Sequence, residues 1–177
     1  MPSCPPGSFS TADLFDTFKP DATANVRVCQ PGLRSYGGRA RYCGRIATVR
    51  NAGDVAMRLR DILEEPGSGR VLVADGRGCS EWALLGDRMA ALAIARGWAG
   101  IVLNGYVRDL AALRGLDIGV HALGSIPSRP DWPSPPQYVR GTPVTILNCA
   151  FMEGAWAYVD EDGILVADRA LVSTAAR

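Results

Sequence analysis

VLVADGRGCSEWALLGDRMAALAIARGWAGIVLNG, residues 71–105, is the stretch of sequence that decides the fold. The run at 71–75 is short and apolar, as in a buried strand, and a second such run follows at 99–104. Between the two runs, residues 82–96 carry apolar side chains at helical spacing and stop at Gly97. A strand, a helix and a strand in this order predict a right-handed crossover unit with two parallel strands.

The sequence on either side of this unit predicts further strands and helices. Upstream, the expected elements are a capped helix that ends near Pro20, strands at 25–28 and 46–49, and a helix at 54–64. Downstream, they are a helix at 109–113, strands at 119–123, 144–147, 156–158 and 164–166, and an irregular, proline-rich segment at 125–137. Asp162-Gly163 has the chemistry of a hairpin turn between the last two strands. The pattern indicates an α/β chain with a parallel central sheet and a strand-rich C-terminal third.

Length, charge and hydropathy narrow the class of protein. The 177 residues suit one compact domain, and the prolines of residues 1–8 predict a flexible leader in front of it. Nineteen basic and eighteen acidic side chains leave a net charge of +1, which gives no electrostatic reason to bind nucleic acid or an anionic membrane. No stretch approaches the ~20 apolar residues of a membrane span, and the N-terminus lacks the features of a signal peptide. We therefore expect a soluble, cytoplasmic protein.

Arg108-Asp109 is the first of two motifs with groups that bind an oxo-acid. It follows the second apolar run, at the edge of a parallel sheet where ligands bind. Arginine binds a carboxylate through two parallel hydrogen bonds, and aspartate oxygen is a ligand that Mg²⁺ or Mn²⁺ accepts. From the residue types alone, Arg108 and Asp109 could equally form an exposed ion pair with no role in binding.

Gly86-Asp87 is the second motif, and twenty residues separate Asp87 from Arg108. A glycine inside a helix costs ~1 kcal/mol relative to alanine, so Gly86 needs a reason such as close ligand approach or a helix that begins there. In the latter case the N–H groups of residues 86–89 would face a bound anion. The alternative is that Asp87 lies with Arg88 on a solvated helix face.

Four segments of the chain resemble the RraA-like family. They are SYGGRARYCGRIATV at 35–49, GRVLVADGRG at 69–78, ALLGDRMAALAIARGWAGIVLNGYVRDLAALRGLDIGVHALG at 83–124 and YVDEDGILV at 158–166. The resemblance implies a three-layer β/β/α swivelling-type domain, with a parallel central sheet and a second antiparallel sheet. It also implies assembly as a homotrimer or hexamer.

The family has two functional branches. One comprises 4-hydroxy-4-methyl-2-oxoglutarate aldolases, which also decarboxylate oxaloacetate, and the other comprises RraA proper, a protein inhibitor of the endoribonuclease RNase E. Aspartate, twenty residues and then Arg-Asp mark the aldolase branch, and Asp87 and Arg108-Asp109 match that spacing. The leading hypothesis is therefore a class II (metal-dependent) lyase that acts on short oxo-acids and forms pyruvate. A regulator of an RNase E-like enzyme is the runner-up, and a similar site for a different oxo-acid is the third hypothesis.

A third name, menaquinone methyltransferase, has been applied to some family members. Nothing in this sequence resembles a glycine-rich S-adenosylmethionine loop after a first strand. The sequence gives that activity little support.

The resemblance also implies a role for each matched residue. Asp109 ligates the divalent cation, Mg²⁺ or Mn²⁺, while Arg108 holds the substrate and stabilises the pyruvate enolate. Asp87 orients water bound to the metal. The substrate carboxylate is received by the backbone N–H groups of Gly86, Asp87, Arg88 and Met89.

Other polar residues have structural or open assignments. In aldolases of this family an acidic side chain of a neighbouring subunit completes the site, and the candidates here are Asp160, Glu161 and Asp162. His121 lies in an apolar run and is predicted to be a core or interface residue. Asp75 either supports the site or caps a turn.

Overall fold

The computed structural model describes residues 9–53, 56–131 and 137–172; the predicted leader at 1–8 and part of the proline-rich segment lie outside these ranges. The helices are α1 (Thr11–Phe18), α2 (Leu59–Leu63), α3 (Asp87–Ala95) and α4 (Leu110–Leu113). In the part of the chain that is described, no helix is long and apolar enough to cross a membrane. The strands are β1 (Arg27–Val28), β2 (Arg34–Ser35), β3 (Tyr42–Asn51), β4 (Val71–Asp75), β5 (Ala83–Leu85), β6 (Gly100–Val107), β7 (Gly119–Ser125), β8 (Tyr138–Arg140), β9 (Val144–Ile146), β10 (Cys149–Phe151), β11 (Trp156–Val159) and β12 (Ile164–Ala167).

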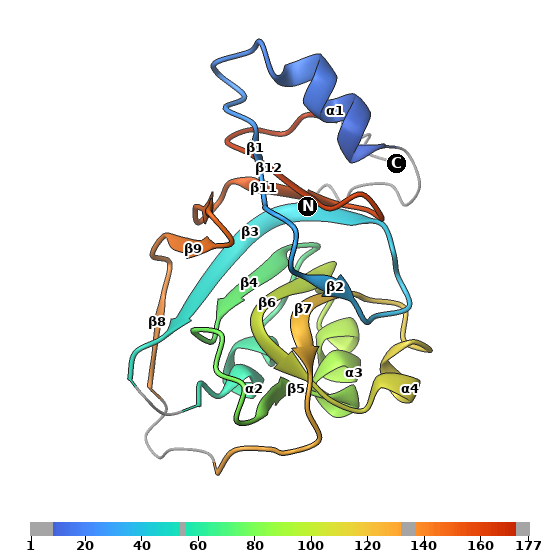
Figure 1. Ribbon diagram of the computed structural model, residues 1–177, viewed down its shortest axis with the longest axis vertical. Coiled ribbons are helices and arrows are strands. Elements are labelled where there is room, and N and C mark those ends of the chain that lie inside the picture. The colour runs from blue at the N-terminus through green and yellow to red at the C-terminus, as the bar shows by residue number, and fades with distance from the viewer. Residues whose placement is uncertain (1–8, 54–55, 132–136, 173–177) are drawn as a thin grey trace.

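Parallel strands form the centre of the molecule. β3, β4, β6 and β7 lie side by side in this order, each parallel to the next. Helices α2, α3 and α4 lie together on one face of these strands (Figure 1). The strand, helix and parallel strand predicted from residues 71–105 are confirmed, since β4 and β6 pair in parallel and α3 lies between them in the sequence.

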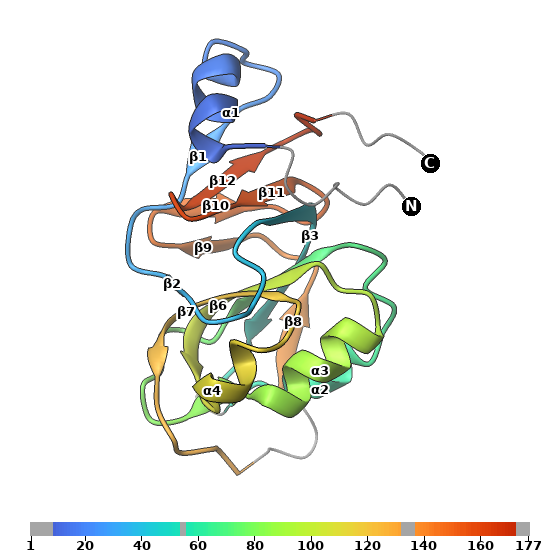
Figure 2. The ribbon, with the colours of Figure 1, turned by 90° about the vertical axis from the view of Figure 1, so that its right-hand side faces the viewer.

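Antiparallel strands continue the sheet beyond β3. The first half of β3, from Tyr42 to Arg45, pairs with β11, which pairs with β12, and β12 pairs with β1. β9 and β10 form a separate two-stranded sheet. Figure 2 shows the layers in turn: α1, the antiparallel strands, the parallel strands and the remaining helices. The predicted β/β/α fold is confirmed, as is the hairpin with Asp162-Gly163 at its turn.

The side chains of each parallel strand fill two different cores. Successive strand residues point to opposite faces of a sheet. In β4, Val71 and Val73 belong to the core against the antiparallel strands, whereas Leu72 and Ala74 belong to the core against the helices. Because both faces are covered, all four side chains are buried, which explains why the sequence is apolar throughout this strand.

Asp160 ties α1 to the antiparallel strands. Its carboxylate is 3% exposed and accepts hydrogen bonds from the Thr11 backbone N–H at 2.7 Å and the Thr11 hydroxyl at 2.6 Å. The Asp162 N–H donates to the same carboxylate at 3.1 Å. Asp160 therefore accepts the first N–H of α1, and the apolar face of this helix packs onto Tyr158 and Leu165.

The helix predicted at residues 82–96 is wrong at its start. Residues Ala83–Leu85 form β5, which pairs in parallel with β6, and α3 begins only at Asp87. The three strand residues are buried and apolar, so they extend the apolar pattern of the helix without a break. The change from strand to helix falls at Gly86.

Candidate active site

β5 and β6 bring the two motifs together at one edge of the sheet. β5 leads into Gly86-Asp87, and its parallel neighbour β6 leads into Arg108-Asp109. The Arg108 N–H donates to the Leu85 carbonyl at 3.0 Å, so the second motif is bonded directly to the residue before Gly86. The two motifs, which are twenty residues apart in the sequence, therefore lie in direct contact in the structure.

Gly86 leaves room for the side chains of Arg108 and Asp109. A Cβ atom at this position would lie 2.6 Å from Asp109 Oδ2, closer than real Cβ contacts, and 3.2 Å from Arg108 Cγ, a tight contact, so both side chains would have to shift. Its backbone angles, φ −137° and ψ −172°, are extended and open to any residue. The missing side chain is what allows the Asp109 carboxylate to reach the start of α3.

Asp109 has an uncommon backbone conformation. It lies in the left-handed region, with φ 61° and ψ 43°, immediately before α4. Such a conformation costs a non-glycine residue about 1 kcal/mol or more, although aspartate tolerates it better than most. The Arg108 Nε donates to Asp109 Oδ2 at 3.2 Å, and both side chains are 36% exposed. The ion pair considered as an alternative therefore exists, but it lies at the start of α3 rather than on an open surface.

Asp87 is the first residue of α3, and its side chain turns back onto the helix end. The Asp87 Oδ1 atom accepts a hydrogen bond from the Arg88 N–H at 2.7 Å. The first N–H groups of a helix have no partner within it and attract anions. A substrate carboxylate at the Arg88 N–H would have to displace the Asp87 side chain, which would then be free to contact water or substrate.

A cleft of about 240 Å³ lies over these groups. Both motifs line it, together with Met89 and the end of β5. Three arginines that the sequence reasoning missed line it as well: Arg58, Arg60 and Arg129. The only signal for them in the sequence is the excess of arginine among the basic residues, because Lys19 is the one lysine in 177 residues.

The carboxylates present suit a hard cation that keeps part of its hydration shell. Within the described ranges no cluster of three or more histidine, cysteine, aspartate or glutamate residues gathers to enclose a metal ion. The cleft offers Asp109 and Asp87. One or two carboxylates, with water and substrate oxygens, are the usual donor set for Mg²⁺.

A lysine-based mechanism has no suitable residue in this cleft. Lys19 follows α1, and α1 lies at the opposite end of the molecule from α3 (Figure 1). An aldolase that forms a Schiff base needs a lysine amine at the substrate carbonyl. The arginine side chains that line the cleft cannot supply one.

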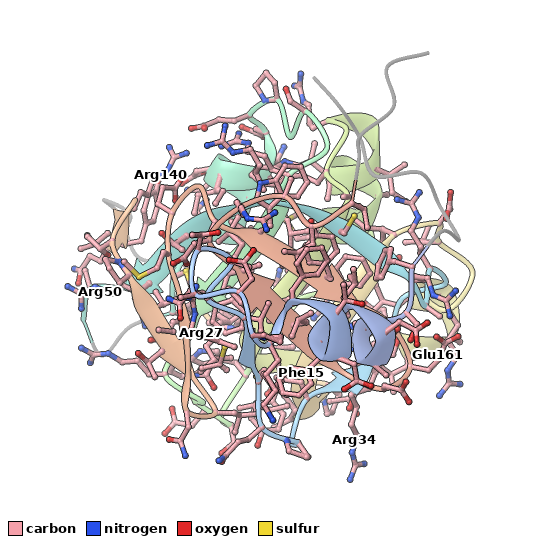
Figure 3. The ribbon with its side chains drawn as sticks, turned by 90° about the horizontal axis from the view of Figure 1, so that it is seen from above. Phe15, Arg27, Arg34, Arg50, Arg140 and Glu161 are labelled. Atoms are coloured by element: carbon pink, nitrogen blue, oxygen red, sulfur yellow. The ribbon has the colours of Figure 1, made fainter. Side chains whose placement is uncertain are left out.

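The remaining candidates have structural partners. Asp160 is engaged by Thr11 and buried, so it is not available to complete a neighbouring site. Glu161 is exposed, pairs with Arg41 at 3.4 Å and lies at the rim of the molecule (Figure 3), and Asp162 is also exposed. Asp75 accepts hydrogen bonds from the Arg77 N–H and the Asn104 amide, which is the turn-capping role.

His121 is a core residue, as predicted. It is 5% exposed, and its Nδ1 lies 2.9 Å from the Tyr42 hydroxyl. Burial lowers the pKa of His121 to about 4, against a smaller opposing effect of the Asp160 charge. The side chain is therefore neutral near pH 7 and does not line the cleft at Gly86.

Similar proteins cover nearly the whole chain. A family model described as RraA-like, Aldolase/RraA, matches residues 11–166. Two curated relatives carry the name "Putative 4-hydroxy-4-methyl-2-oxoglutarate aldolase". The protein from Laribacter hongkongensis is 44% identical over 157 residues, which are 89% of this chain and 94% of the relative. The protein from Burkholderia multivorans is 43% identical over 165 residues, which are 93% of this chain and 99% of the relative.

Two solved structures share the fold at more than 30% sequence identity. One is described as an S-adenosylmethionine:2-dimethylmenaquinone methyltransferase from Geobacillus kaustophilus, with TM-score 0.83, 36% identity, and 92% of this chain and 97% of that chain covered. The other is described as the RNA-processing inhibitor RraA from Thermus thermophilis, with TM-score 0.80, 35% identity and 90% and 92% covered. The family match, the relatives and the fold agree, and the chain belongs to the RraA-like family.

Proposed function

We propose that this chain is a divalent-metal-dependent lyase that cleaves 4-hydroxy-4-methyl-2-oxoglutarate to pyruvate and also decarboxylates oxaloacetate. The observation that carries the proposal is the contact at Gly86, where a Cβ atom would lie 2.6 Å from Asp109 Oδ2. That approach brings the Asp109 carboxylate to the start of α3, where backbone N–H groups attract an anion. The names of the relatives from Laribacter and Burkholderia support the same activity.

The substrate's first carboxylate binds at the start of α3. There the N–H groups of Gly86, Asp87, Arg88 and Met89 meet the positive end of the helix dipole. The Arg108 guanidinium contacts the 2-oxo oxygen, where negative charge develops as pyruvate enolate forms. Arg108 is well suited to this because its backbone is fixed by the bond to Leu85.

Asp109, with Asp87 nearby, would hold a divalent cation such as Mg²⁺ or Mn²⁺ in the cleft. The cation supplies Lewis-acid stabilisation of the enolate charge when it is bound. The left-handed backbone of Asp109 directs its carboxylate toward Gly86 and the α3 end rather than along α4.

Cleavage needs one proton removed and one returned. In the aldol reaction, a water held by Asp87 and Arg108 takes the 4-hydroxyl proton, the C3–C4 bond breaks, and its electrons remain on the pyruvate half as the enolate. Water beside Asp87 then returns a proton to C3. In oxaloacetate, loss of CO₂ replaces the first proton transfer.

We further propose that the site is completed at a subunit interface in a homotrimer or hexamer. Asp87 and Asp109 are the acidic residues among the described ones that line the cleft, and a carboxylate from a neighbour would add a further acidic group. Glu161 and Asp162 remain the candidates, because both are exposed.

The test is release of pyruvate from oxaloacetate, coupled to lactate dehydrogenase and corrected for the spontaneous reaction. We expect activity with Mg²⁺ or Mn²⁺, loss on addition of EDTA, and recovery with excess metal. Asp109→Ala should abolish the metal dependence and Arg108→Ala should remove turnover by about 10²–10³-fold, both with an unchanged far-UV circular dichroism spectrum. Wild-type protein that gives no metal-dependent pyruvate from either substrate would show the proposal to be wrong.

Regulation of an RNase E-like endoribonuclease is the second candidate, favoured by the likeness to the Thermus inhibitor. It predicts that the chain lowers the cleavage rate of such an enzyme and that Asp109→Ala leaves this effect intact. Inhibition without lyase activity would replace the first proposal.

A further inference from the structure

The cleft carries far more positive charge than the rest of the chain. Among the described residues that line it, Asp87 and Asp109 are acidic and five are arginines: Arg58, Arg60, Arg88, Arg108 and Arg129. The whole chain has a net charge of only +1. A local excess of this kind attracts a ligand with more than one negative charge.

The arginines approach the cleft from opposite sides. α3 contacts both α2 and α4, and Figure 1 shows these two helices on either side of it. Arg108 and Asp109 come from the α4 side, whereas Arg58 is the residue that precedes α2. A substrate held by its oxo-acid end at Arg108 would therefore extend toward Arg58.

Arg58 has donors to spare for a ligand. Its side chain is 39% exposed, and its Nε lies 3.4 Å from Asp61 Oδ1, longer than the ~2.7–2.9 Å of a strong charge-assisted bond. It does not cap α2 with its side chain. Arg60 differs, because its Nε is engaged by Glu64 at 2.8 Å.

Arg129 is brought to the cleft by the segment after β7. The Ser128 carbonyl accepts a hydrogen bond from the Ala83 N–H at 2.9 Å, and the Ser128 hydroxyl donates to the Glu81 carbonyl. These bonds join the residue before Arg129 to the start of β5. Among the residues that the structure describes, no ion pair engages the Arg129 guanidinium, although it lines a cleft with two carboxylates.

We infer that Arg58 and Arg129 bind the second carboxylate of a dicarboxylate substrate and thereby determine specificity. The inference rests on the proposed function, since it takes the first carboxylate and oxo group to be bound at α3 and Arg108. Two guanidinium groups from different elements surround a carboxylate with more donors than one arginine can offer. The preferred substrates are then oxo-acids whose leaving half ends in a carboxylate.

The experiment compares two substrates that differ only in this group. 4-Hydroxy-4-methyl-2-oxoglutarate cleaves to two molecules of pyruvate. 4-Hydroxy-4-methyl-2-oxopentanoate has a methyl group in place of the second carboxylate and cleaves to pyruvate and acetone. Both break the same C3–C4 bond and leave the same enolate, so a residue that acts only on the second carboxylate changes the rate with the first substrate alone.

We expect wild-type kcat/KM to favour the dicarboxylate by about 100-fold, as two charge-assisted interactions allow. Arg58→Ala and Arg129→Ala should each lower kcat/KM for the dicarboxylate by about 10-fold or more and change it for the monocarboxylate by less than about 3-fold. Arg58→Lys should restore part of the loss. Arg96→Ala, at the far end of α3, removes the same charge outside the cleft and should leave both substrates unaffected.

A third measurement separates this inference from the proposed function. Exchange of the pyruvate methyl protons for deuterium, followed by proton NMR with Mg²⁺, requires enolate formation but no second carboxylate. If both arginine variants exchange normally and lose the dicarboxylate selectively, the inference holds. If wild type exchanges but the substitutions lower kcat/KM equally for both substrates, or for neither, the inference about the second carboxylate is wrong. The proposed lyase activity is then still supported by the exchange. If wild type neither exchanges nor cleaves, both are wrong.

Discussion

Asp160 and Asp109 show how differently the two ends of this molecule treat a carboxylate. Asp160, at the α1 end, is 3% exposed and accepts hydrogen bonds from both the N–H and the hydroxyl of Thr11. Asp109, at the α3 end, is 36% exposed, has one ion pair at 3.2 Å and a left-handed backbone. The hydrogen-bonding capacity of the first carboxylate is satisfied by the fold, whereas the second carboxylate lies on a residue with an unfavourable backbone conformation and keeps oxygen lone pairs free to accept bonds or bind a cation.

The difference separates groups that stabilise the fold from groups that are available for chemistry. Buried polar groups are matched by partners because an unmatched group costs free energy. His121 follows the same rule as Asp160, since it is buried beside the Tyr42 hydroxyl. Asp109 differs from both, because it combines a left-handed backbone with an exposed carboxylate beside the cleft. Changes at the α1 end should therefore alter stability, and changes at the α3 end should alter activity.

Gly86→Ala should give the largest effect and should fall on activity. The new Cβ would displace the Asp109 carboxylate and the Arg108 side chain, which lie 2.6 Å and 3.2 Å from it. We expect kcat for oxaloacetate to fall by about 10³-fold, ~4 kcal/mol in the barrier, because the cation ligand and the enolate donor both move. Stability should change little, since the backbone of Gly86 is extended and the displaced groups are side chains.

Gly115→Ala is the matched control for this change. A Cβ there would lie 3.5 Å from the Ala112 carbonyl, an ordinary contact, and the residue is outside the cleft. Steady-state kinetics and urea unfolding of the two variants make the comparison. Unchanged turnover in Gly86→Ala would mean that the close approach has no catalytic purpose.

Asp160→Ala should come next and should fall on stability. It leaves the Thr11 N–H and hydroxyl without their acceptor in a buried place, and loss of two such bonds to a charged group costs about 3 kcal/mol. The free energy of unfolding in urea measures this. Asp162→Ala removes an exposed carboxylate two residues away and should cost less than about 0.5 kcal/mol. A large loss of kcat in folded Asp160→Ala would contradict the proposal that the α1 end affects stability and not activity.

The fold was predictable from the sequence where one pattern dominates. The apolar runs at β4 and β6 predicted buried parallel strands, and in the structure both faces of these strands are covered. The pattern failed at Ala83–Leu85, where a buried strand runs directly into an apolar helix. Periodicity does not separate two buried elements that follow each other without a polar break.

The site was predictable only in part. The sequence indicates a special role for Gly86 and shows the spacing of Asp87 from Arg108, but the contact between the two motifs depends on the pairing of β5 with β6. That pairing leaves no local signal. Arg58 and Arg129 were missed because they come from a helix start and a proline-rich segment that only the tertiary fold brings to the same cleft.

His121 offers a pH-dependent test of the α1 side of the comparison. Burial lowers its pKa from 6.5 to about 4, so between these values the unfolded chain takes up a proton that the folded chain refuses. His121 therefore does not affect the free energy of unfolding well above pH 6.5, the pKa of the unfolded chain, and lowers it as the pH falls below that pKa. From about pH 7.5 to about pH 5 the fall should be about 2 kcal/mol.

The measurement is the free energy of unfolding of wild type and His121→Gln at several pH values in this window. The variant has no group that titrates there at this position, so its curve should be flatter by the same amount. Parallel curves for the two proteins would mean that the folded protein protonates His121 as readily as the unfolded chain does.

Asp109→Gly should give the smallest change in stability, and that change should have the opposite sign to its effect on activity. Glycine adopts the left-handed conformation of residue 109, φ 61°, without strain, and the ion pair that is lost is half-exposed and contributes little. We expect the free energy of unfolding to rise by about 1 kcal/mol while metal-dependent pyruvate release disappears. Asp109→Asn tolerates the same backbone and should lose activity without a gain in stability. A loss of stability in Asp109→Gly would mean that Asp109 is a structural residue like Asp160, and the contrast between the two ends would then rest on Gly86 and Arg108 alone.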